Sequence, residues 1–459
     1  MTISLTRSLA RHLGQPVDTA TRERAILHVL DWLGCAVIGS TEPVGQLLLT
    51  RASQTPAGQI SIIGGSGTSV PDQAVFCNGG LGNVLEMDDI HRTAILHPGP
   101  VVIPAALAAA EMAETQADAF LDAVVRGYES QIRIGIAVGP GHYANWHNTA
   151  TCGPFGAAAA AGSVMELDED RIVWALGNAG TQSSGPWRCR HEQVMTKQLH
   201  TARAAEAGFV AASLAAIGFS GPQFILEGEQ GFFDAMCPDP CKECILAKLD
   251  GPWRIWETSF KPWPACRHAH AAIDAALELR RRHDLQSDDI SEVGIRTFAD
   301  AMRFCDRQDP ASTLEAKFSL QHSVAVALLE GEPDLQHFEK TTILRRDVGG
   351  LRARTSVQET ERFQKRYPGH FGSGVDITMS DGTVLSVDAP DALGDPENPL
   401  TEERIVAKSR RLMAAARLPD QSIEQMIDAT LSLRTTGSLA RFSALAGDIA
   451  SHMAQGRTA

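Results

Sequence analysis

The chain has 459 residues, of which 44% are hydrophobic and 21% are charged, and its formal net charge is −14 at pH 7. This composition is typical of a globular protein and excludes an intrinsically disordered chain. The acidic balance argues against nucleic acid as a partner, because an acidic surface repels phosphate. An anionic substrate would therefore need cations that are gathered locally in a cleft.

The sequence contains no run of about 18 apolar residues, so we expect no membrane association. Residues 1–15 lack the apolar core of a secretory signal, which predicts a cytoplasmic protein. The nine cysteines are an odd number in a chain without such a signal, and we expect them to be reduced thiols.

Apolar residues recur at three- and four-residue spacing through much of the segment 20–260, which predicts helices. The clearest examples are 22–37, 104–114, 117–136 and 197–217. Alanines and glycines fill 153–162, and such small residues let helix axes approach closely in a buried bundle.

Two prolines interrupt the helical pattern in Lys261-Pro262-Trp263-Pro264, and we place a domain boundary there. The segments that follow predict two helices, a strand and a β-hairpin around the turn Ser380-Asp381-Gly382. Their ranges are 270–282 and 316–329 for the helices, 290–297 for the strand, and 374–379 and 383–387 for the hairpin.

Residues 401–459 return to the pattern of amphipathic helices. The predicted fold is therefore mainly α, with a large all-helical domain formed by both chain ends and a smaller inserted α+β domain. The expected ranges are 1–262 for the first part of the helical domain, 263–395 for the α+β domain, and 396–459 for the C-terminal helices that complete the helical domain.

The first cluster of chemically useful side chains contains Asp88, Asp89, His91 and His97. A carboxylate beside an imidazole can tune its pKa for general acid or base catalysis. Alternatively, the aspartates cap a helix and the histidines lie on the surface.

A second and a third cluster precede small-residue helices. His147 and Thr149 lie in a polar loop before the helix at 153–162, and Lys197 and His200 open the helix at 197–217. The amino end of a helix favours an anion, and a lysine there can meet a substrate carboxylate. The alternatives are a histidine that only makes structural hydrogen bonds and a solvated lysine.

The fourth cluster, Arg267, His268 and His270, follows the domain boundary. On a helix the two histidines would not share a face, whereas on a strand they would. They could instead be hydrogen-bonding residues at a domain seam.

Metal and nucleotide sites have little support in the sequence. Cys237, Cys241 and Cys244 have a spacing seen in metal-cluster enzymes, but prolines separate them and no fourth ligand is evident. The zinc-protease, phosphate-loop, dinucleotide and serine-hydrolase motifs are all missing. We therefore expect no metal and no cofactor.

Several motifs in this order resemble the MmgE/PrpD family, which includes 2-methylcitrate dehydratase, cis-aconitate decarboxylase and iminodisuccinate epimerase. The resemblance implies a helical domain with a smaller lid, a homodimer, and no metal or organic cofactor. The motifs are Leu30-Asp31-Trp32-Leu33-Gly34, Asn78-Gly79, Glu86-Met87-Asp88-Asp89-Ile90-His91, His97-Pro98-Gly99, Trp146-His147, Gly153-Pro154-Phe155-Gly156, Thr196-Lys197-Gln198-Leu199-His200, the stretch from Lys261 to His268, Leu314-Glu315-Ala316-Lys317-Phe318-Ser319 and Asn398-Pro399-Leu400.

The resemblance also implies which residues form the active site: an acid within Glu86–Asp89, His97, His147, Lys197, and either His268 or His270. Cis-aconitate decarboxylases carry a lid tyrosine that this chain replaces with Met302-Arg303-Phe304-Cys305. This departure argues against decarboxylation of cis-aconitate.

The sequence thus predicts a cofactor-independent lyase that abstracts a proton α to a carboxylate of a small di- or tricarboxylate. Dehydration is the first interpretation; epimerisation of an amino- or hydroxy-dicarboxylate and decarboxylation remain open, as does a non-catalytic binding protein. The predicted catalytic residues are Asp88, Asp89, His97, His147 and Lys197, and the predicted substrate-binding residues are His91, Thr149, His200, Arg267, His268 and His270. Which residue is the acid and which the base stays open.

Overall fold

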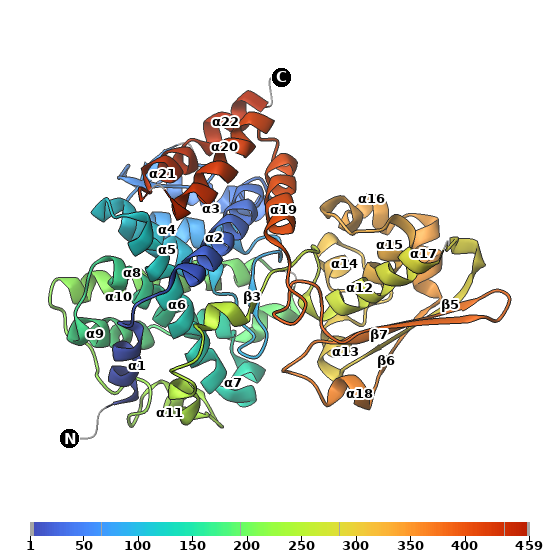
Figure 1. Ribbon diagram of the computed structural model, residues 1–459, viewed down its shortest axis with the longest axis horizontal. Coiled ribbons are helices and arrows are strands. Elements are labelled where there is room, and N and C mark those ends of the chain that lie inside the picture. Colours follow the sequence, from blue (N-terminus) through green and yellow to red (C-terminus); the bar gives the residue numbers. More distant parts are fainter. Residues whose placement is uncertain (1–3, 66, 193, 284, 436, 457–459) are drawn as a thin grey trace. The chain divides into compact units, whose positions relative to one another are not determined.

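The chain divides into two units in the computed structural model, which describes residues 4–65, 67–192, 194–283, 285–435 and 437–456 (Figure 1). The helical unit comprises Met1–Thr258 and Thr401–Ala459, and the smaller unit comprises Ser259–Leu400. Helices predominate in the helical unit, and the smaller unit adds a four-stranded sheet, which confirms the prediction of a mainly α chain. The terminal residues 1–3 and 457–459 of the predicted ranges lie outside the described residues.

The helical unit is built from helices that come from both ends of the chain. The helices before the smaller unit are α1 Leu5–Leu13, α2 Thr19–Gly39, α3 Pro43–Ser53, α4 Pro71–Gly82, α5 Gly99–Ala113, α6 Ala117–Ala137, α7 Gly139–Asn145, α8 Asn148–Val164, α9 Glu169–Gly180, α10 Thr196–Ala216 and α11 Phe232–Met236. The helices after it are α19 Glu402–Ala415, α20 Asp420–Leu431, α21 Ala440–Gly447 and α22 Ile449–Gly456.

Short elements join these helices. They are the strands β1 Ile60–Ser61, β2 Thr68–Ser69, β3 Ile90–His91 and β4 Thr258–Ser259, and the 3-10 helices η1 Trp187–His191, η2 Lys242–Leu246, η3 Arg254–Glu257 and η6 Ser432–Arg434. Within the described residues, no helix has both the length and the apolar character that crossing a bilayer requires.

Helix α8 forms the centre of the core, where it packs against α6 and α10. Its alanines from 157 to 161 are all buried, as the small-residue run predicts. Glycines allow this close packing: a Cβ atom added to Gly208 of α10 would lie 2.2 Å from the carbonyl oxygen of Pro154 in α8. Because α10 begins at Thr196, this contact also fixes the helix that carries Lys197 and His200.

The C-terminal helices return to the start of the chain. Helix α19 packs against α2 (Figure 1). There, the Oγ of Ser409 donates a hydrogen bond of 2.9 Å to the carbonyl oxygen of Leu30. Thr401 caps α19 by accepting from the backbone N–H of Arg404.

The smaller unit combines helices with a sheet in the order β6-β5-β7-β8. Its strands are β5 Ile290–Thr297, β6 Thr355–Glu359, β7 Ser373–Met379 and β8 Val384–Ala389. Its helices are α12 Arg267–Arg282, α13 Ala299–Cys305, α14 Thr313–Lys317, α15 Leu320–Glu330, α16 Lys340–Ile343, α17 Arg346–Ala353 and α18 Glu361–Gln364, with the 3-10 helices η4 Ser287–Asp289 and η5 Leu335–Phe338.

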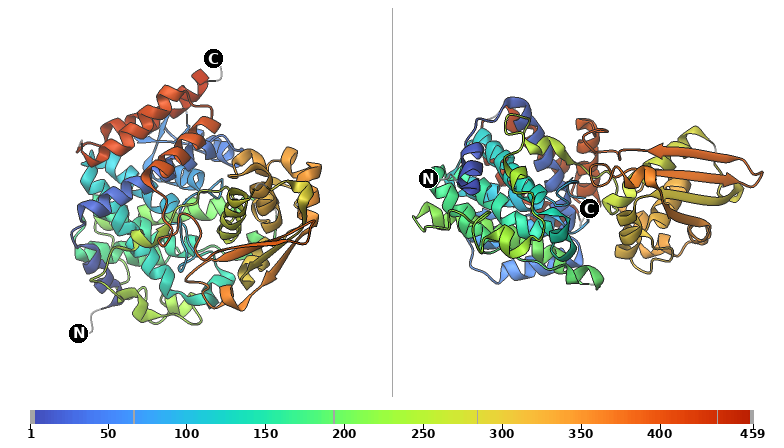
Figure 2. Two further views of the ribbon diagram at one scale, coloured as in Figure 1. Left: turned by 45° about the vertical axis from the view of Figure 1, so that its right-hand side comes forward. Right: turned by 90° about the horizontal axis from the view of Figure 1, so that it is seen from below.

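Strand β5 pairs parallel to β6 and antiparallel to β7, and β7 pairs antiparallel to β8. The last pair is the predicted hairpin, and Gly382 takes a positive φ of 86° in its turn, a conformation that glycine adopts at little cost. Helix α12 packs against β7 and β8, and α15 packs against α12 (Figure 2). Helix α12 begins at Arg267, three residues before the predicted start, and so contains His268 and His270.

We expect Gly208→Ala to lower the free energy of unfolding by about 1–3 kcal/mol, because the added methyl group overpacks the α8–α10 contact. The matched control is Gly67→Ala, where an added Cβ meets nothing within 4 Å. The control should stay within about 0.5 kcal/mol of the wild type. Urea unfolding followed by circular dichroism measures both, and equal stabilities would contradict the packing described here.

Candidate active site

His97 precedes α5 and is held by contacts on several sides. Its Nδ1 lies 2.9 Å from Oδ2 of Asp88 and 2.9 Å from the carbonyl oxygen of Asp89. Its backbone N–H donates to Oγ1 of Thr149 over 3.1 Å, and its carbonyl oxygen accepts from Nε2 of Gln131. Because Nδ1 faces two oxygen acceptors, it carries the proton, which leaves Nε2 as the basic nitrogen.

Asp88 and Asp89 are buried and bonded to the protein itself. Asp88 accepts from the side-chain amide of Asn83 at 2.8 Å. Asp89 accepts from the hydroxyl of Tyr128 at 2.5 Å and from the N–H of Gly99 at 2.9 Å. The side chain of Asp88 thus supports His97, and that of Asp89 is held by Tyr128 and Gly99; the catalytic role of both aspartates stays a prediction.

Electrostatics agrees with this supporting role. Burial raises the pKa of Asp89 to about 6, although the hydrogen bonds from Tyr128 and Gly99 lower it. His28 also contacts Asp89, with its Nδ1 2.7 Å from Oδ2, and burial lowers the pKa of His28 well below its usual value. The carboxylate of Asp89 is therefore fixed from several directions.

Lys408 supports the acidic segment 86–89 from the C-terminal helix α19. Its Nζ donates to Oδ1 of Asp31 at 2.6 Å and to the carbonyl oxygen of Met87 at 2.6 Å. Burial raises the pKa of Asp31 to about 6, which Lys408 opposes. The pair is buried, and it ties both ends of the chain to the loop that carries the candidate carboxylates.

Glu86 is the carboxylate of this segment that reaches Lys197. The two side chains form an ion pair between the loop after α4 and the first turn of α10. The side chain of Lys197 remains 21% exposed. Glu86 has a φ of 61°, which is strained for a residue with a Cβ and typical of functional positions. The predicted catalytic set names Asp88 and Asp89 instead, because sequence spacing alone cannot show which of the neighbouring carboxylates faces the lysine.

His147 and His200 form an imidazole pair beside Lys197. Their Nδ1 atoms lie 3.3 Å apart, so one ring donates and the other accepts. Burial lowers the pKa of His147 well below its usual value, and the positive charge of Lys197 acts in the same direction. Burial and Lys197 likewise lower the pKa of His200. Both rings are therefore neutral near pH 7 and able to accept a proton.

These interactions show that three of the predicted clusters meet. Lys197 lowers the pKa of both His147 and His200, and His97 lowers the pKa of His147. Thr149 is fully buried, and its hydroxyl holds the backbone of His97 rather than facing solvent. We call Glu86, His97, His147, Lys197 and His200 the acid–base cluster.

His91 does not join this cluster. It is buried, its Nδ1 accepts from the N–H of Ala94 at 3.1 Å, and its Nε2 lies 3.3 Å from Glu257. Both ring nitrogens are thus used inside the protein. These internal contacts hold the ring of His91, and its substrate-binding role stays a prediction.

The fourth predicted cluster lies in the smaller unit and is largely engaged in internal contacts. Arg267 is buried, pairs with Asp395 and donates to the carbonyl oxygen of Leu393. His270 contacts Arg267 through Nδ1 at 3.0 Å and the carbonyl oxygen of Ala265 through Nε2 at 3.0 Å. The substrate-binding role of Arg267 and His270 stays a prediction. His268 contacts the thiol of Cys266 instead, at 3.3 Å.

The cysteine prediction needs a correction. Cys241 and Cys244 form a disulfide, whereas the other cysteines are free thiols, Cys237 among them. We expected all nine cysteines to be reduced, but Cys241 and Cys244 are separated by only two residues and can bond to each other.

In the described part of the smaller unit, His370, Asp391 and Glu397 could hold a cation, although Arg366 already contacts Asp391 at 3.4 Å.

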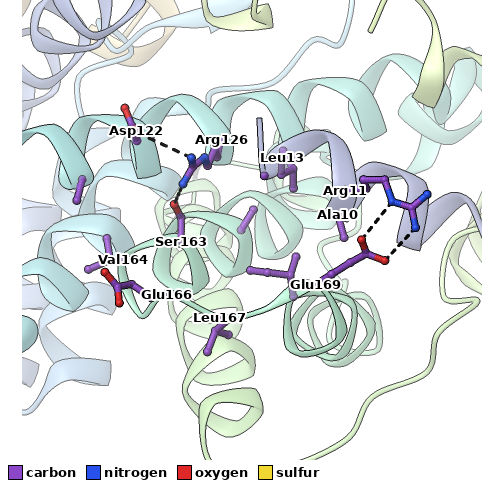
Figure 3. Close-up of a pocket in the computed structure, with 14 residues that line it drawn as sticks. Ala10, Arg11, Leu13, Asp122, Arg126, Ser163, Val164, Glu166, Leu167 and Glu169 are labelled. Atoms are coloured by element: carbon purple, nitrogen blue, oxygen red, sulfur yellow. Dashed lines mark hydrogen bonds and ion pairs between the residues drawn. The ribbon is translucent and has the colours of Figure 1, made fainter. Parts of the chain in front are cut away.

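A pocket of about 390 Å³ lies elsewhere in the helical unit, beside α1, α6 and α9 (Figure 3). Two of its charged groups have partners: Arg11 pairs with Glu169, and Arg126 donates to Ser163. It contains no member of the acid–base cluster, so we do not assign chemistry to it.

We expect Lys408→Met to lower the free energy of unfolding by about 3–5 kcal/mol, because Asp31 is then left buried without its counter-charge. The double variant Lys408→Met/Asp31→Asn should be more stable than the single variant, since neither charge remains. Lys365→Met is the control, as its ion pair with Glu361 is exposed and should contribute about 0–1 kcal/mol. Urea denaturation distinguishes these cases, and a single variant as stable as the control would refute the supporting role of Lys408.

Comparisons with known proteins show the family to which this chain belongs. The MmgE/PrpD N-terminal domain matches residues 4–244, and the MmgE/PrpD C-terminal domain matches residues 263–433. A cis-aconitate decarboxylase of Aspergillus terreus is 28% identical over 438 residues, which cover 90% of this chain and 88% of that protein. The human cis-aconitate decarboxylase is 26% identical over 435 residues, 88% of this chain and 86% of that protein.

A mitochondrial 2-methylcitrate dehydratase of Yarrowia lipolytica is also similar, with 27% identity over 173 residues, 36% of this chain and 33% of that protein. The two domain matches together span most of the sequence and follow each other in the expected order. This chain therefore belongs to the MmgE/PrpD family.

Proposed function

We propose that this protein is a cofactor-independent lyase that dehydrates a small hydroxy di- or tricarboxylate by removing a proton α to a carboxylate. The observation that carries this proposal is the acid–base cluster itself, in which neutral imidazoles lie beside an ammonium group. The named relatives support the class, because a decarboxylase and a dehydratase are both lyases.

Lys197 would bind the substrate carboxylate next to the carbon that loses its proton. An incoming carboxylate competes with Glu86 for the ammonium group, and a charge-assisted contact of this kind is both strong and orienting. The same positive charge then stabilises the negative charge that builds up on the substrate as the proton leaves.

His97 would act as the base through Nε2. Its Nδ1–H points at Asp88, so the imidazolium formed by proton abstraction gains a nearby negative charge. The imidazolium of His97 would then pass this proton to the leaving hydroxyl, while the neutral His147–His200 pair holds the hydroxyl by a hydrogen bond. The hydroxyl and this proton leave together as water, and a double bond remains between the two carbons.

Decarboxylation is the second candidate, because relatives that match this chain over most of its length are cis-aconitate decarboxylases. Against it stands the segment 302–305, which lacks a tyrosine. The smaller unit does hold Tyr367, but its hydroxyl donates to Asp300 at 2.7 Å. Dehydration therefore remains the preferred interpretation.

Incubation with citrate-like, tartrate-like, amino-dicarboxylate and cis-aconitate substrates in D₂O, followed by NMR, tests the reaction. Dehydration predicts loss of the hydroxyl from a citrate-like substrate with formation of an alkene. Release of CO₂ from cis-aconitate would identify a decarboxylase, and deuterium uptake with inversion alone would identify an epimerase. If the protein shows no turnover and no deuterium exchange with any of these substrates, it is a binding protein and the proposal is overturned.

We expect His97→Gln and Lys197→Met each to reduce kcat/KM by roughly 10²–10⁴-fold, the usual contribution of a positioned acid, base or charge. The matched controls are His283→Gln and Arg203→Met, because His283 is exposed and Arg203 lies on the outer face of α10, paired with Glu206. Steady-state kinetics on the substrate found above is the measurement. Full activity in His97→Gln or Lys197→Met protein that folds normally would refute this assignment.

A further inference from the structure

A second group of reactive side chains lies in the smaller unit and takes no part in the proposed dehydration. It consists of Cys266, which caps the start of α12, His268 in the first turn of α12, and Cys305 at the end of α13. The Sγ of Cys266 lies 3.3 Å from Nδ1 of His268. Cys266 and Cys305 both belong to the buried core of the smaller unit, where α12 packs against α13. We call these residues the thiol cluster.

Aromatic rings hold the imidazole of this cluster in place. The ring of His268 stacks on Phe371 with centroids 5.0 Å apart, and Phe304 and Phe298 lie at 5.2 Å and 5.7 Å. Because the ring is enclosed, its Nδ1 stays directed at the sulfur of Cys266. The backbone of Cys266 is also fixed, because its N–H donates to the carbonyl oxygen of Lys317 at 2.8 Å.

This environment favours a thiolate at Cys266. The hydrogen bond from Cys305, with help from His268, lowers the pKa of Cys266 well below its usual value, although burial opposes the shift. Cys77 provides a contrast in the same chain, because burial raises the pKa of its thiol to about 12. The thiolate is the form that reacts with oxidants, so the two cysteines should differ strongly in reactivity.

We propose that Cys266 and Cys305 form a peroxide-sensitive thiol pair that oxidises to an intramolecular disulfide. The thiolate sulfur of Cys266 attacks one oxygen of hydrogen peroxide, the O–O bond breaks, and the departing hydroxide takes a proton from His268 and leaves as water. The sulfur of Cys305 then attacks the resulting sulfenic acid, and the hydroxyl leaves with the proton of Cys305 as a second water. Two thiols are oxidised and one peroxide is reduced.

The test uses the full-length protein, fully reduced and then exposed to a limited amount of hydrogen peroxide. Free thiols are alkylated at successive times, and peptides are analysed by mass spectrometry. We expect a linked Cys266–Cys305 peptide that is two hydrogens lighter than the sum of its parts and reverts with dithiothreitol. Its formation should be at least about 10-fold faster than oxidation of Cys77, in keeping with the difference in thiolate content.

Variants separate the steps. In Cys305→Ser protein, Cys266 should stop at the sulfenic acid, which dimedone traps, and His268→Gln should slow the first step. Because linked Cys241–Cys244 gives a different peptide, it does not interfere with the measurement. The proposal is overturned if Cys266 reacts no faster than Cys77, or if the wild-type protein accumulates the sulfenic acid without forming the linked peptide.

Discussion

The ion pair between Glu86 and Lys197 is the contact on which the candidate site depends. It joins side chains that are 111 positions apart, one in the loop after α4 and one in the first turn of α10. Without it, the lysine would be an ordinary solvated cation and the glutamate an ordinary loop residue. Together they place a positive charge beside His147 and His200, and burial and this charge keep both imidazoles neutral.

A buried layer holds this pair in position. Asp88 orients His97, Tyr128 and His28 fix Asp89, and Lys408 holds the carbonyl of Met87. Burying so many polar groups costs stability unless each has a partner, which explains why these side chains bind one another so closely. The C-terminal helix α19 contributes the lysine, so the final part of the chain serves the site as well as the core.

Much of the fold could be predicted from local patterns. Three- and four-residue spacing indicated the helices, and Asp381-Gly382 indicated the hairpin, because both depend on neighbouring residues alone. The same holds for His97, His147, Lys197 and His200, which stood out as polar residues at the starts of apolar helices. The family resemblance is confirmed by both domain matches.

The features that local patterns could not predict depend on contacts between residues far apart in the sequence. Asp395 binds Arg267 from 128 positions away, so no local pattern marked that arginine as structural. Glu257 binds His91 in the same way, from 166 positions away. The ion pair of Glu86 with Lys197 spans 111 positions, so sequence spacing could not distinguish Glu86 from Asp88 and Asp89.

The central claim is that Lys197 and the two histidines share one pocket and one electrostatic field. NMR titration of the imidazole resonances tests it most directly, in wild-type and Lys197→Met protein with labelled histidine. Removing the positive charge should raise the pKa of His147 and of His200. Identical titration curves for His147 and His200 in the two proteins would contradict the account.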